Sequence, residues 1–343
     1  MKVVVLAGGL SPERDVSLSS GSLIANALIE NGHEVFLLDL YKGVDEISED
    51  LFVDRNSGKK FEYEVKMSDP DLEELKREVD NGKSLIGRNV IELCLRADAV
   101  FLALHGDIGE NGKLQAIFDC YGIVYTGTSY IGSLLAMDKD IAKKFMVQNN
   151  IRTADWKMIN VENFNEKFKF PCVVKPCSCG SSVGVSIVND TDELTKAIDF
   201  VKKYEKNVII ERMIKGREFS VGILDGKALP VIEIIPNEGF YDYKSKYQKG
   251  FATEICPAEL DEKITLSLQE DALKVHKVLR LGAYSRVEFI LDENGDAFCL
   301  EANTLPGMTP TSLVPQEALV AGISYNDLCE RILNLAIRDV KND

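Results

Sequence analysis

Several residue types and patterns are scarce in this chain of 343 residues, and each scarcity excludes a class of protein. Lysine and arginine number 40 against 55 acidic residues, so the net charge of −15 excludes the basic surface that nucleic acids and anionic membranes require. No apolar run approaches the roughly 18 residues of a membrane span. The start MKVVVLAGG continues directly into GGLSPERD, which is typical of a core strand and not of a signal peptide. We therefore expect a cytoplasmic globular protein.

Histidine and paired cysteine are also scarce, which bears on metal and redox sites. The chain has 3 histidines and 8 cysteines, and no two cysteines have the C-x-x-C spacing. Cys177 and Cys179 are a candidate redox or metal pair, but no histidine or further cysteine nearby completes a site. Reduced thiols in a cytosolic protein are the simpler interpretation.

Strand and helix patterns alternate through residues 1–128, which predicts an open parallel α/β domain. Strands are expected at KVVVLA, EVFLLDL, AVFLAL and IVYTGT, and helices at VSLSSGSLIANALIENG and GKLQAIFDCYG. Residues 41–92 are charged and irregular, so we interpret them as a surface insertion with a small hairpin and a helix.

The pattern changes after residue 128. A long helix is expected over SYIGSLLAMDKDIAKKFMVQNN, followed by short strands at WKMIN, PCVVKP, GVSIV, NVIIERMI, EFSVGIL and ALPVIEI. This predicts α+β structure with antiparallel sheets, which we divide into subdomains at residues 129–217 and 218–343. Residues 234–253 read as a long polar and aromatic loop, and loops of that length are often lids.

The hairpin RVEFILDENGDAFCLEANT carries the most informative polar residues. Its turn at residues 293–295 places Arg286 and Glu288 on one strand near Glu301 and Asn303 on the other. Residues two apart in a strand point to the same face. Two carboxylates and an amide oxygen suit a hard cation such as Mg²⁺. A solvated polar face is the alternative, but the sequel NTLPGMTPTSLVP has the turn residues and hydroxyls of a substrate-lining loop.

Two glycine-containing loops are candidates for binding phosphate. The stretch KPCSCGSSVGVSIV joins two β-branched strands, yet it matches neither G-x-x-x-x-G-K-[ST] nor G-x-G-x-x-G. The stretch GGLSPE with Asp39 as a ribose acid would suit a dinucleotide-binding dehydrogenase. That interpretation is weak, because G-x-G-x-x-G is missing and the loop contains Pro12.

Seven stretches, in order, resemble the D-alanine–D-alanine ligases of the ATP-grasp superfamily. They are GGLSPERDVSLSSG, ALHGDIGENGKLQ, MDK (137–139), VVKPCSCGSSVGVS, ERMIKGREFSV, EGFYDYKSKY and LEANTLPGMTPTSLVP, and they span Gly8 to Pro315. The resemblance implies an N-terminal parallel α/β domain followed by an ATP-grasp fold of two α+β subdomains. In such folds a glycine-rich strand–loop–strand closes over the phosphates of ATP. The resemblance does not cover residues 41–92.

The activity that the resemblance implies is the ATP-dependent ligation of two D-alanines through an acyl phosphate, for peptidoglycan precursors. It also implies two Mg²⁺ ions, with Mn²⁺ as a substitute, and a homodimer that binds neither nucleic acid nor membrane. A D-Ala–D-Ser or D-Ala–D-lactate ligase remains an alternative, as does a non-enzymatic nucleotide-binding module.

The same resemblance implies roles for individual residues. Those for ATP are Lys139, Lys175, Ser181, Ser182, Glu211, Arg212, Met213, Ile214, Glu218, Phe240 and Lys246. Those for the amino-acid substrates are Glu13, His105, Arg286, Ser312 and Leu313. Those for catalysis are Glu13, Ser181, Tyr247, Arg286 and Gly307, and those for the metal ions are Glu288, Glu301 and Asn303.

Three positions sharpen these expectations. Many relatives have aspartate where this chain has Glu288, whose longer side chain still offers a carboxylate. Some have lysine where this chain has Arg212, which matters little where its main chain contacts adenine. A tyrosine at the position of Tyr247 accompanies peptide synthesis in the family, where it forms a latch with Ser181 and Glu13. We therefore expect D-alanine to be preferred over D-lactate as acceptor.

Overall fold

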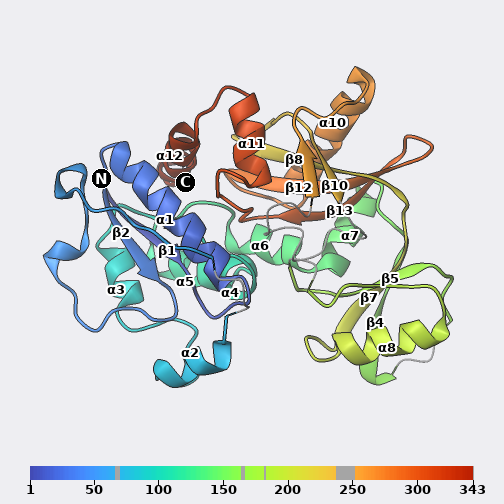
Figure 1. Cartoon of the computed structure of the whole chain (residues 1–343), viewed down its shortest axis with the longest axis horizontal. Coiled ribbons are helices and arrows are strands. Elements are labelled where there is room, and N and C mark those ends of the chain that lie inside the picture. The colour runs from blue at the N-terminus through green and yellow to red at the C-terminus, as the bar shows by residue number, and fades with distance from the viewer. Residues whose placement is uncertain (66–69, 164–166, 181–182, 237–251, 343) are drawn as a thin grey trace.

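The computed structural model describes residues 1–65, 70–163, 167–180, 183–236 and 252–342. Within these ranges the strands form three sheets, arranged along an elongated molecule (Figure 1). Both chain ends lie beside the first sheet, because helix α12 (Tyr325–Asn342) returns to pack against α1 (Arg14–Glu30). No helix in the described ranges has the length and apolar character needed to cross a bilayer.

The first sheet is parallel, with the strand order β2-β1-β3. Its strands are β1 (Lys2–Ala7), β2 (Glu34–Asp39) and β3 (Ala99–Leu102). From Val3 to Ala7 strand β1 is fully buried, as expected for a parallel strand covered on both faces. Helices α1, α3 (Val90–Leu95), α4 (Asp107–Glu110) and α5 (Lys113–Tyr121) belong to this part of the chain. The predicted parallel α/β domain is confirmed.

The prediction of a fourth strand at residues 123–128 is wrong. Tyr125 forms a single parallel bridge with Val100. The hydroxyl of Thr126 accepts the N–H of Leu102 at 3.0 Å, in the place of the next ladder bond. Gly127 then adopts a φ of +99°, which L-residues rarely adopt, and the chain turns away.

The hairpin expected within residues 41–92 is not found in the described part of that segment. The segment instead holds two 3₁₀ helices, Glu49–Leu51 and Arg55–Ser57, and helix α2 (Leu72–Glu78). Val53 pairs with Val35 of β2 in an isolated antiparallel bridge. The segment is therefore held at the edge of the first sheet without forming a sheet of its own.

The long helix expected after residue 128 is broken into α6 (Tyr130–Met137) and α7 (Lys139–Gln148). Asp138 has an extended backbone conformation, and its side chain accepts the N–H of Ile141 at 2.9 Å. An aspartate in this position is a helix N-cap, so it starts a new helix instead of continuing the first. The break places Lys139 in the first turn of α7.

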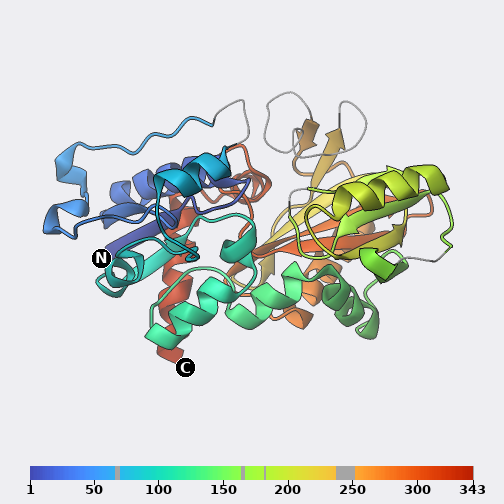
Figure 2. The same ribbon diagram turned by 90° about the horizontal axis from the view of Figure 1, so that it is seen from below.

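The second sheet is antiparallel, with the order β4-β7-β5-β6. Its strands are β4 (Trp156–Asn160), β5 (Cys172–Pro176), β6 (Ser186–Val188) and β7 (Asn207–Arg212), and a short 3₁₀ helix (Val161–Asn163) follows β4. Helix α8 (Thr191–Val201) packs on it and closes a separate small core, seen at the right of Figure 2. As predicted, β5 and β6 pair on either side of the glycine-rich segment.

The third sheet has the order β11-β10-β8-β12-β13, with β9 paired to β8. Its strands are β8 (Gly216–Leu224), β9 (Lys227–Ala228), β10 (Ile232–Pro236), β11 (Ala252–Ile255), β12 (Tyr284–Asp292) and β13 (Ala297–Asn303). Helix α10 (Glu262–Val278) packs against β8 and β12, and α11 (Leu313–Val320) also contacts β8. The predicted hairpin is confirmed: Arg286 and Glu288 lie beside Asn303 and Glu301, in a register that shifts by one residue at a β-bulge between Glu288 and Phe289.

Candidate active site

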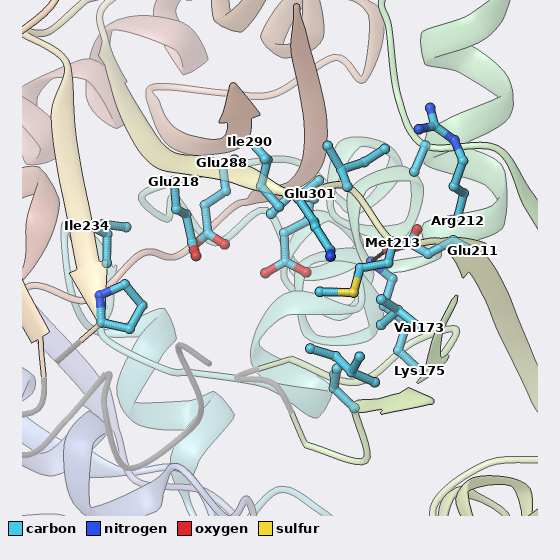
Figure 3. Close-up of a pocket in the computed structure, with 18 of the residues that line it drawn as sticks. Val173, Lys175, Glu211, Arg212, Met213, Glu218, Ile234, Glu288, Ile290 and Glu301 are labelled. Atoms are coloured by element: carbon cyan, nitrogen blue, oxygen red, sulfur yellow. Dashed lines mark ion pairs between the residues drawn. The ribbon is translucent and has the colours of Figure 1, made fainter. Parts of the chain in front are cut away.

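A cavity of about 760 Å³ lies between the second and third sheets (Figure 3). Its walls come from β5, β6 and β7 on one side and from β8, β10, β12 and β13 on the other. Apolar side chains, among them Val173, Ile187 and Ile290, alternate with charged ones around it. This volume lies in the range of about 300–1,000 Å³ that small-molecule and cofactor sites occupy.

A buried carboxylate between two lysines lies at one wall of this large cavity. Glu211 pairs with Lys175 at 2.7 Å and with Lys143 at 2.8 Å, and each of the three side chains is less than a tenth exposed. Lys143 also donates to the hydroxyl of Thr153 at 2.6 Å. Burial opposes the charge on Glu211, but the two lysines hold its pKa below the usual value. Burial lowers the pKa of Lys143 despite this partner.

A second lysine–carboxylate pair links α7 to β13. Lys139 Nζ lies 3.4 Å from a carboxylate oxygen of Glu301 and donates to the carbonyl oxygen of Cys179 at 2.7 Å. Desolvation opposes its charge, but Glu301 and the nearby thiols raise the pKa of Lys139 above its usual value. Lys139 is therefore a cation held between β13, which carries two of the candidate metal ligands, and the glycine-rich segment.

Three carboxylates from β8, β12 and β13 gather at the other side of the large cavity. Figure 3 shows Glu218, Glu288 and Glu301 projecting into the same region. Arg286 forms a close ion pair with Glu288. The side-chain nitrogen of Asn303 is buried without a hydrogen-bond partner among the described residues.

This donor set fits a hard cation. Two carboxylates of adjacent strands and an amide oxygen are the ligands that Mg²⁺ and Mn²⁺ accept, and phosphate oxygens commonly complete the shell. The unpartnered amide nitrogen of Asn303 fits the same site, because a phosphate oxygen could accept from it. The residues present therefore suit a divalent cation bound together with a nucleotide.

A much smaller cavity, of about 50 Å³, adjoins this acidic region. It is lined by Glu13, His105, Glu110, Gly180, Glu254, Arg286, Asn303, Leu305, Pro306, Gly307, Thr311, Ser312 and Leu313. These residues follow β1 and β3, lie in β11, β12 and β13 or the loop after β13, or come from the glycine-rich segment and the start of α11. Polar groups of both charges converge here, which suits a small zwitterion.

His105 and Glu110 of this small cavity have shifted pKa values. Burial lowers the pKa of His105, whose Nδ1 donates to the carbonyl oxygen of Leu305 at 3.0 Å. Desolvation, with the neighbouring Glu13 carboxylate, raises the pKa of Glu110 to about 7. His105 is thus neutral near pH 7, and its proton lies on the nitrogen that faces the loop after β13.

The loop after β13 brings Gly307 and Ser312 together. A side chain on Gly307 would place its Cβ 2.8 Å from the hydroxyl of Ser312, so that hydroxyl would have to move. Ser312 precedes α11 as its N-cap residue, and its hydroxyl accepts the N–H of Thr309 at 3.1 Å. The start of α11 and the Gly307 main chain therefore face the same small cavity.

Matches to known proteins agree with this arrangement of sheets and cavities. The family model described as D-ala D-ala ligase N-terminus matches residues 2–128, and that described as D-ala D-ala ligase C-terminus matches residues 138–334. The chain belongs to the D-alanine–D-alanine ligase family. As a member of that family it has an ATP-grasp fold behind an open parallel α/β domain.

Relatives of this ligase-family chain match it over nearly their whole length. D-alanine–D-alanine ligases from Pediococcus pentosaceus and Lacticaseibacillus casei are 43% and 41% identical to it, over 97% of this chain and 97% and 95% of theirs. A crystal structure of D-alanine–D-alanine ligase from Bacillus anthracis complexed with ATP has a TM-score of 0.77 at 31% identity, covering 100% of this chain and 98% of that one.

Most of the residues to which the ligase resemblance assigned roles line the two cavities. The ATP-assigned residues Lys139, Lys175, Glu211, Arg212, Met213, Ile214 and Glu218 all line the large one. The side chain of Arg212 points away from it in Figure 3 and lies 3.6 Å from Asp155, so its main chain faces the cavity. Ser181, Ser182, Phe240, Lys246 and Tyr247 lie outside the described residues.

The dehydrogenase alternative is not supported by Asp39. The carboxylate of Asp39 forms a close ion pair with Arg14 and accepts the N–H groups of Tyr41 and Lys42 at 2.9 and 3.0 Å. These bonds occupy the acid in structural contacts. All 8 cysteines are free thiols, and no cluster of three metal-binding His, Cys, Asp or Glu groups occurs in the described residues.

Sequence reasoning missed three titratable groups near this ligase-family site: the partly buried Glu110 and the buried Lys143 and Glu317. Glu110 belongs to the motif HGDIGENG. Its position four residues after Gly106 could have marked it as a candidate site residue. Lys143 lies one helical turn after Lys139, on the same side of α7. Glu317 accepts the N–H of Gly222 at 2.7 Å, 95 residues away, and nothing local marks it.

Proposed function

We propose that this protein joins two molecules of D-alanine into D-alanyl-D-alanine at the cost of ATP, for peptidoglycan precursors. The observation that carries the proposal is the large nucleotide-sized cavity with Lys139, Lys175 and the Glu288–Glu301 pair, which opens beside a small cavity suited to a zwitterion. The names of the full-length relatives support the choice of D-alanine, and the ATP complex of the Bacillus anthracis ligase supports the choice of nucleotide.

The first step is phosphoryl transfer. The carboxylate of the first D-alanine attacks the γ-phosphorus of ATP, and the bond from that phosphorus to the bridging oxygen breaks. The products are an acyl phosphate and ADP. In this proposal Lys139 and Lys175 hold the phosphates, and Glu13 with His105 beside it binds the ammonium group of the first D-alanine. Such a transfer depends on positioning and on neutralising charge more than on covalent help.

The second step forms the peptide bond. The amine of the second D-alanine, after losing a proton, attacks the acyl carbon, and phosphate leaves from the tetrahedral intermediate. Arg286 and the N–H of Gly307 would stabilise the oxyanion, and Ser312 with the main chain of Leu313 would hold the second carboxylate. Water must be kept out, because it would hydrolyse the acyl phosphate.

Glu288, Glu301 and Asn303 would hold the divalent cations in this proposal. When bound, Mg²⁺ neutralises phosphate charge and orients the transferred group. The adenine would lie against the main chain of Glu211 to Ile214, with Glu218 at the ribose. We extend the proposal to a cytoplasmic homodimer, to domain boundaries near residues 128 and 217, and to contributions from Ser181, Ser182, Phe240, Lys246 and Tyr247.

Phosphate release measured with four amino or hydroxy acids tests the proposal. We expect release with ATP, Mg²⁺ and D-alanine, much less with D-serine or D-lactate as acceptor, and none with L-alanine. A clear preference for D-serine or D-lactate would replace the acceptor in the proposal. No release with any of the four substrates would leave a nucleotide-binding module as the better description.

A further inference from the structure

Two hydrogen bonds join the loop after β3 to the loop after β13, and a third holds the Glu110 side chain against its own loop. Glu110 accepts the N–H of Gly106 at 2.8 Å with one carboxylate oxygen and the N–H of Leu305 at 3.2 Å with the other. His105 donates to the carbonyl oxygen of the same Leu305 at 3.0 Å. Both polar main-chain groups of Leu305 are therefore bound by residues about 200 positions earlier in the chain. We name this set of bonds the Glu110 clasp.

The local structure leaves little freedom on either side of the clasp. Gly106 has a φ of +68°, and a Cβ there would lie 2.7 Å from a carboxylate oxygen of Glu13. Glu110 ends the one-turn helix α4, which folds its carboxylate back onto the Gly106 amide. On the other side Leu305 is 3% exposed and packs close to Gly127. The Leu305 side chain thus packs into the apolar core of the first domain, and the clasp binds the main chain of Leu305 to the loop after β3.

The two loops carry groups with different proposed roles. The loop after β3 carries His105 and lies against Glu13, which belong to the binding of the first amino acid. The loop after β13 runs from Asn303 to Gly307, the candidate metal ligand and the oxyanion donor. An error of about 1 Å between such groups can cost on the order of a hundredfold in rate, so a device that sets their separation has kinetic value.

We infer that Glu110 is a positioning residue whose carboxylate holds the His105 loop of the first domain against the Asn303–Gly307 loop of the third sheet. The inference rests on the proposed function for its kinetic consequence only. Glu110 acts through the amides of Gly106 and Leu305, so its effect must be present before any substrate binds. That property separates a positioning role from direct substrate contact.

The test uses Glu110→Gln, which keeps the shape of the side chain. One oxygen still accepts a backbone N–H, but the other becomes an NH₂ group that faces a donor. In the free enzyme we expect the Gly106 or Leu305 amide to exchange its hydrogen at least tenfold faster, measured by mass spectrometry on short peptides covering residues 104–108 and 303–308. The exchange is measured at pH 8, above the pKa of about 7 that burial gives Glu110, so the native carboxylate is ionised. Hydrogen bonds to charged groups are strong enough for a change of about this size.

The kinetic readout should separate the two substrates. In Glu110→Gln we expect kcat/KM for D-alanine to fall at least tenfold, while KM for ATP stays within about twofold of the native value, because Glu110 does not line the large cavity. A purely structural loss of stability would affect both substrates. Glu92→Gln, an exposed glutamate on α3 that pairs only with Arg96 among described residues, is the matched control and should leave both readouts unchanged.

Either of two results would overturn the inference: native exchange rates at both amides in Glu110→Gln, or native kcat/KM for D-alanine. If the glutamine variant does not fold, Glu110→Asp carries the same test, and its shorter side chain should release the longer bond, to Leu305, first. If the native protein itself releases no phosphate with D-alanine, the proposed function fails. The exchange measurement would still decide whether the clasp exists.

Discussion

The two cavities of the site lie side by side but are built differently. The large cavity takes most of its charged residues from strands and from the first turn of α7, and its Lys139 and Lys175 pair with carboxylates. The small cavity takes most of its residues from segments that follow strands in two parts of the chain. Hydrogen bonds from side chains to main-chain groups, as in the Glu110 clasp, hold it together.

This difference has a physical consequence. Where charges are paired inside a sheet framework, removing one leaves a buried partner without compensation, and the folded state should lose stability. Where loops are held by single hydrogen bonds, a substitution should change the placement of substrate groups more than the stability. The predictions below, in decreasing order of expected effect, test whether the two cavities respond in these two ways.

The largest effect is expected from Lys143→Met, which removes the deeply buried partner of Glu211. The side chain of Lys143 is 1% exposed and that of Glu211 is 5% exposed. Breaking a buried pair from one side costs about 3–5 kcal/mol, and we expect about 3 because Lys175 remains. Thermal unfolding would measure the loss, and KM for ATP should rise because Lys175 and Glu211 line the large cavity.

Lys144→Met is the control for that variant. Lys144 is the next residue of α7, its side chain is 63% exposed, and it pairs with Asp140 at 2.6 Å. The lysine end of this pair is solvated, and the buried Asp140 keeps its hydrogen bond from the indole N–H of Trp156 at 2.9 Å. We therefore expect a loss of about 1 kcal/mol, clearly less than in Lys143→Met. Equal stability of the two variants would contradict the role given to buried pairing in the large cavity.

Glu301→Gln should have the next largest effect, and it should affect rate more than stability. Replacing a metal-bridging carboxylate by an amide is expected to lower phosphate release at least a hundredfold, about 2.7 kcal/mol in activation free energy. Glu293→Gln, in the exposed turn of the same hairpin, should retain native turnover. Near-native turnover of Glu301→Gln would remove Glu301 from the proposed metal ligands.

The strand-built parts of this comparison could be predicted from sequence. A period of two placed Arg286 with Glu288 and Glu301 with Asn303, but the pairing of Glu288 with Glu301 also depends on a β-bulge between Glu288 and Phe289 that the sequence did not predict. The strands around the glycine-rich segment followed from the same period of two.

The parts that were missed depend on capping or on distant partners. Asp138 sits inside an apolar helical pattern, and its capping bond to Ile141 ended the helix that the periodicity predicted. The bond from Leu305 to Glu110 spans 195 residues, and no local pattern signals such a contact. Whether a glutamate is exposed or binds a distant loop depends on the tertiary structure.

A third prediction concerns the pH dependence of stability at Glu317, on α11 behind the small cavity. Burial raises the pKa of Glu317 to about 8 in the folded protein, whereas an unfolded glutamate ionises near about 4.3. Between these values the folded chain binds one proton more, so stability falls as pH rises. Glu317→Gln cannot ionise and should remove about 2 kcal/mol of that fall between about pH 6 and pH 8.

Thermal unfolding of native protein and Glu317→Gln at several pH values would check this. The difference in unfolding temperature between the two should grow with pH in favour of the variant, while Glu293→Gln should track the native protein. If the unfolding temperatures of Glu317→Gln and native protein changed in parallel with pH, Glu317 would be ionised in the folded protein. Its contact with the Gly222 amide would then be a charged one.

The smallest effect is expected from Tyr63→Phe, which tests how far the segment 41–92 influences the small cavity. Tyr63 donates to a carboxylate oxygen of Asp15 at 2.7 Å, and desolvation with this bond raises the pKa of Tyr63 to about 12. Asn26 binds both main-chain groups of Phe61, at 2.7 and 2.9 Å, so the segment is tied to α1 at two places. Asp15 lies two residues after Glu13.

Loss of one half-buried hydrogen bond should cost about 1 kcal/mol, visible as a slightly lower unfolding temperature. The remaining Asn26 bonds keep the segment in place, so KM for D-alanine should stay within about twofold of native, unlike in Glu110→Gln. Tyr121→Phe, whose ring is 56% exposed on α5, controls for loss of a hydroxyl. If Tyr63→Phe raised KM for D-alanine tenfold, α1 would transmit strain to Glu13. The small cavity would then depend on the surface segment as well as on the clasp between its loops.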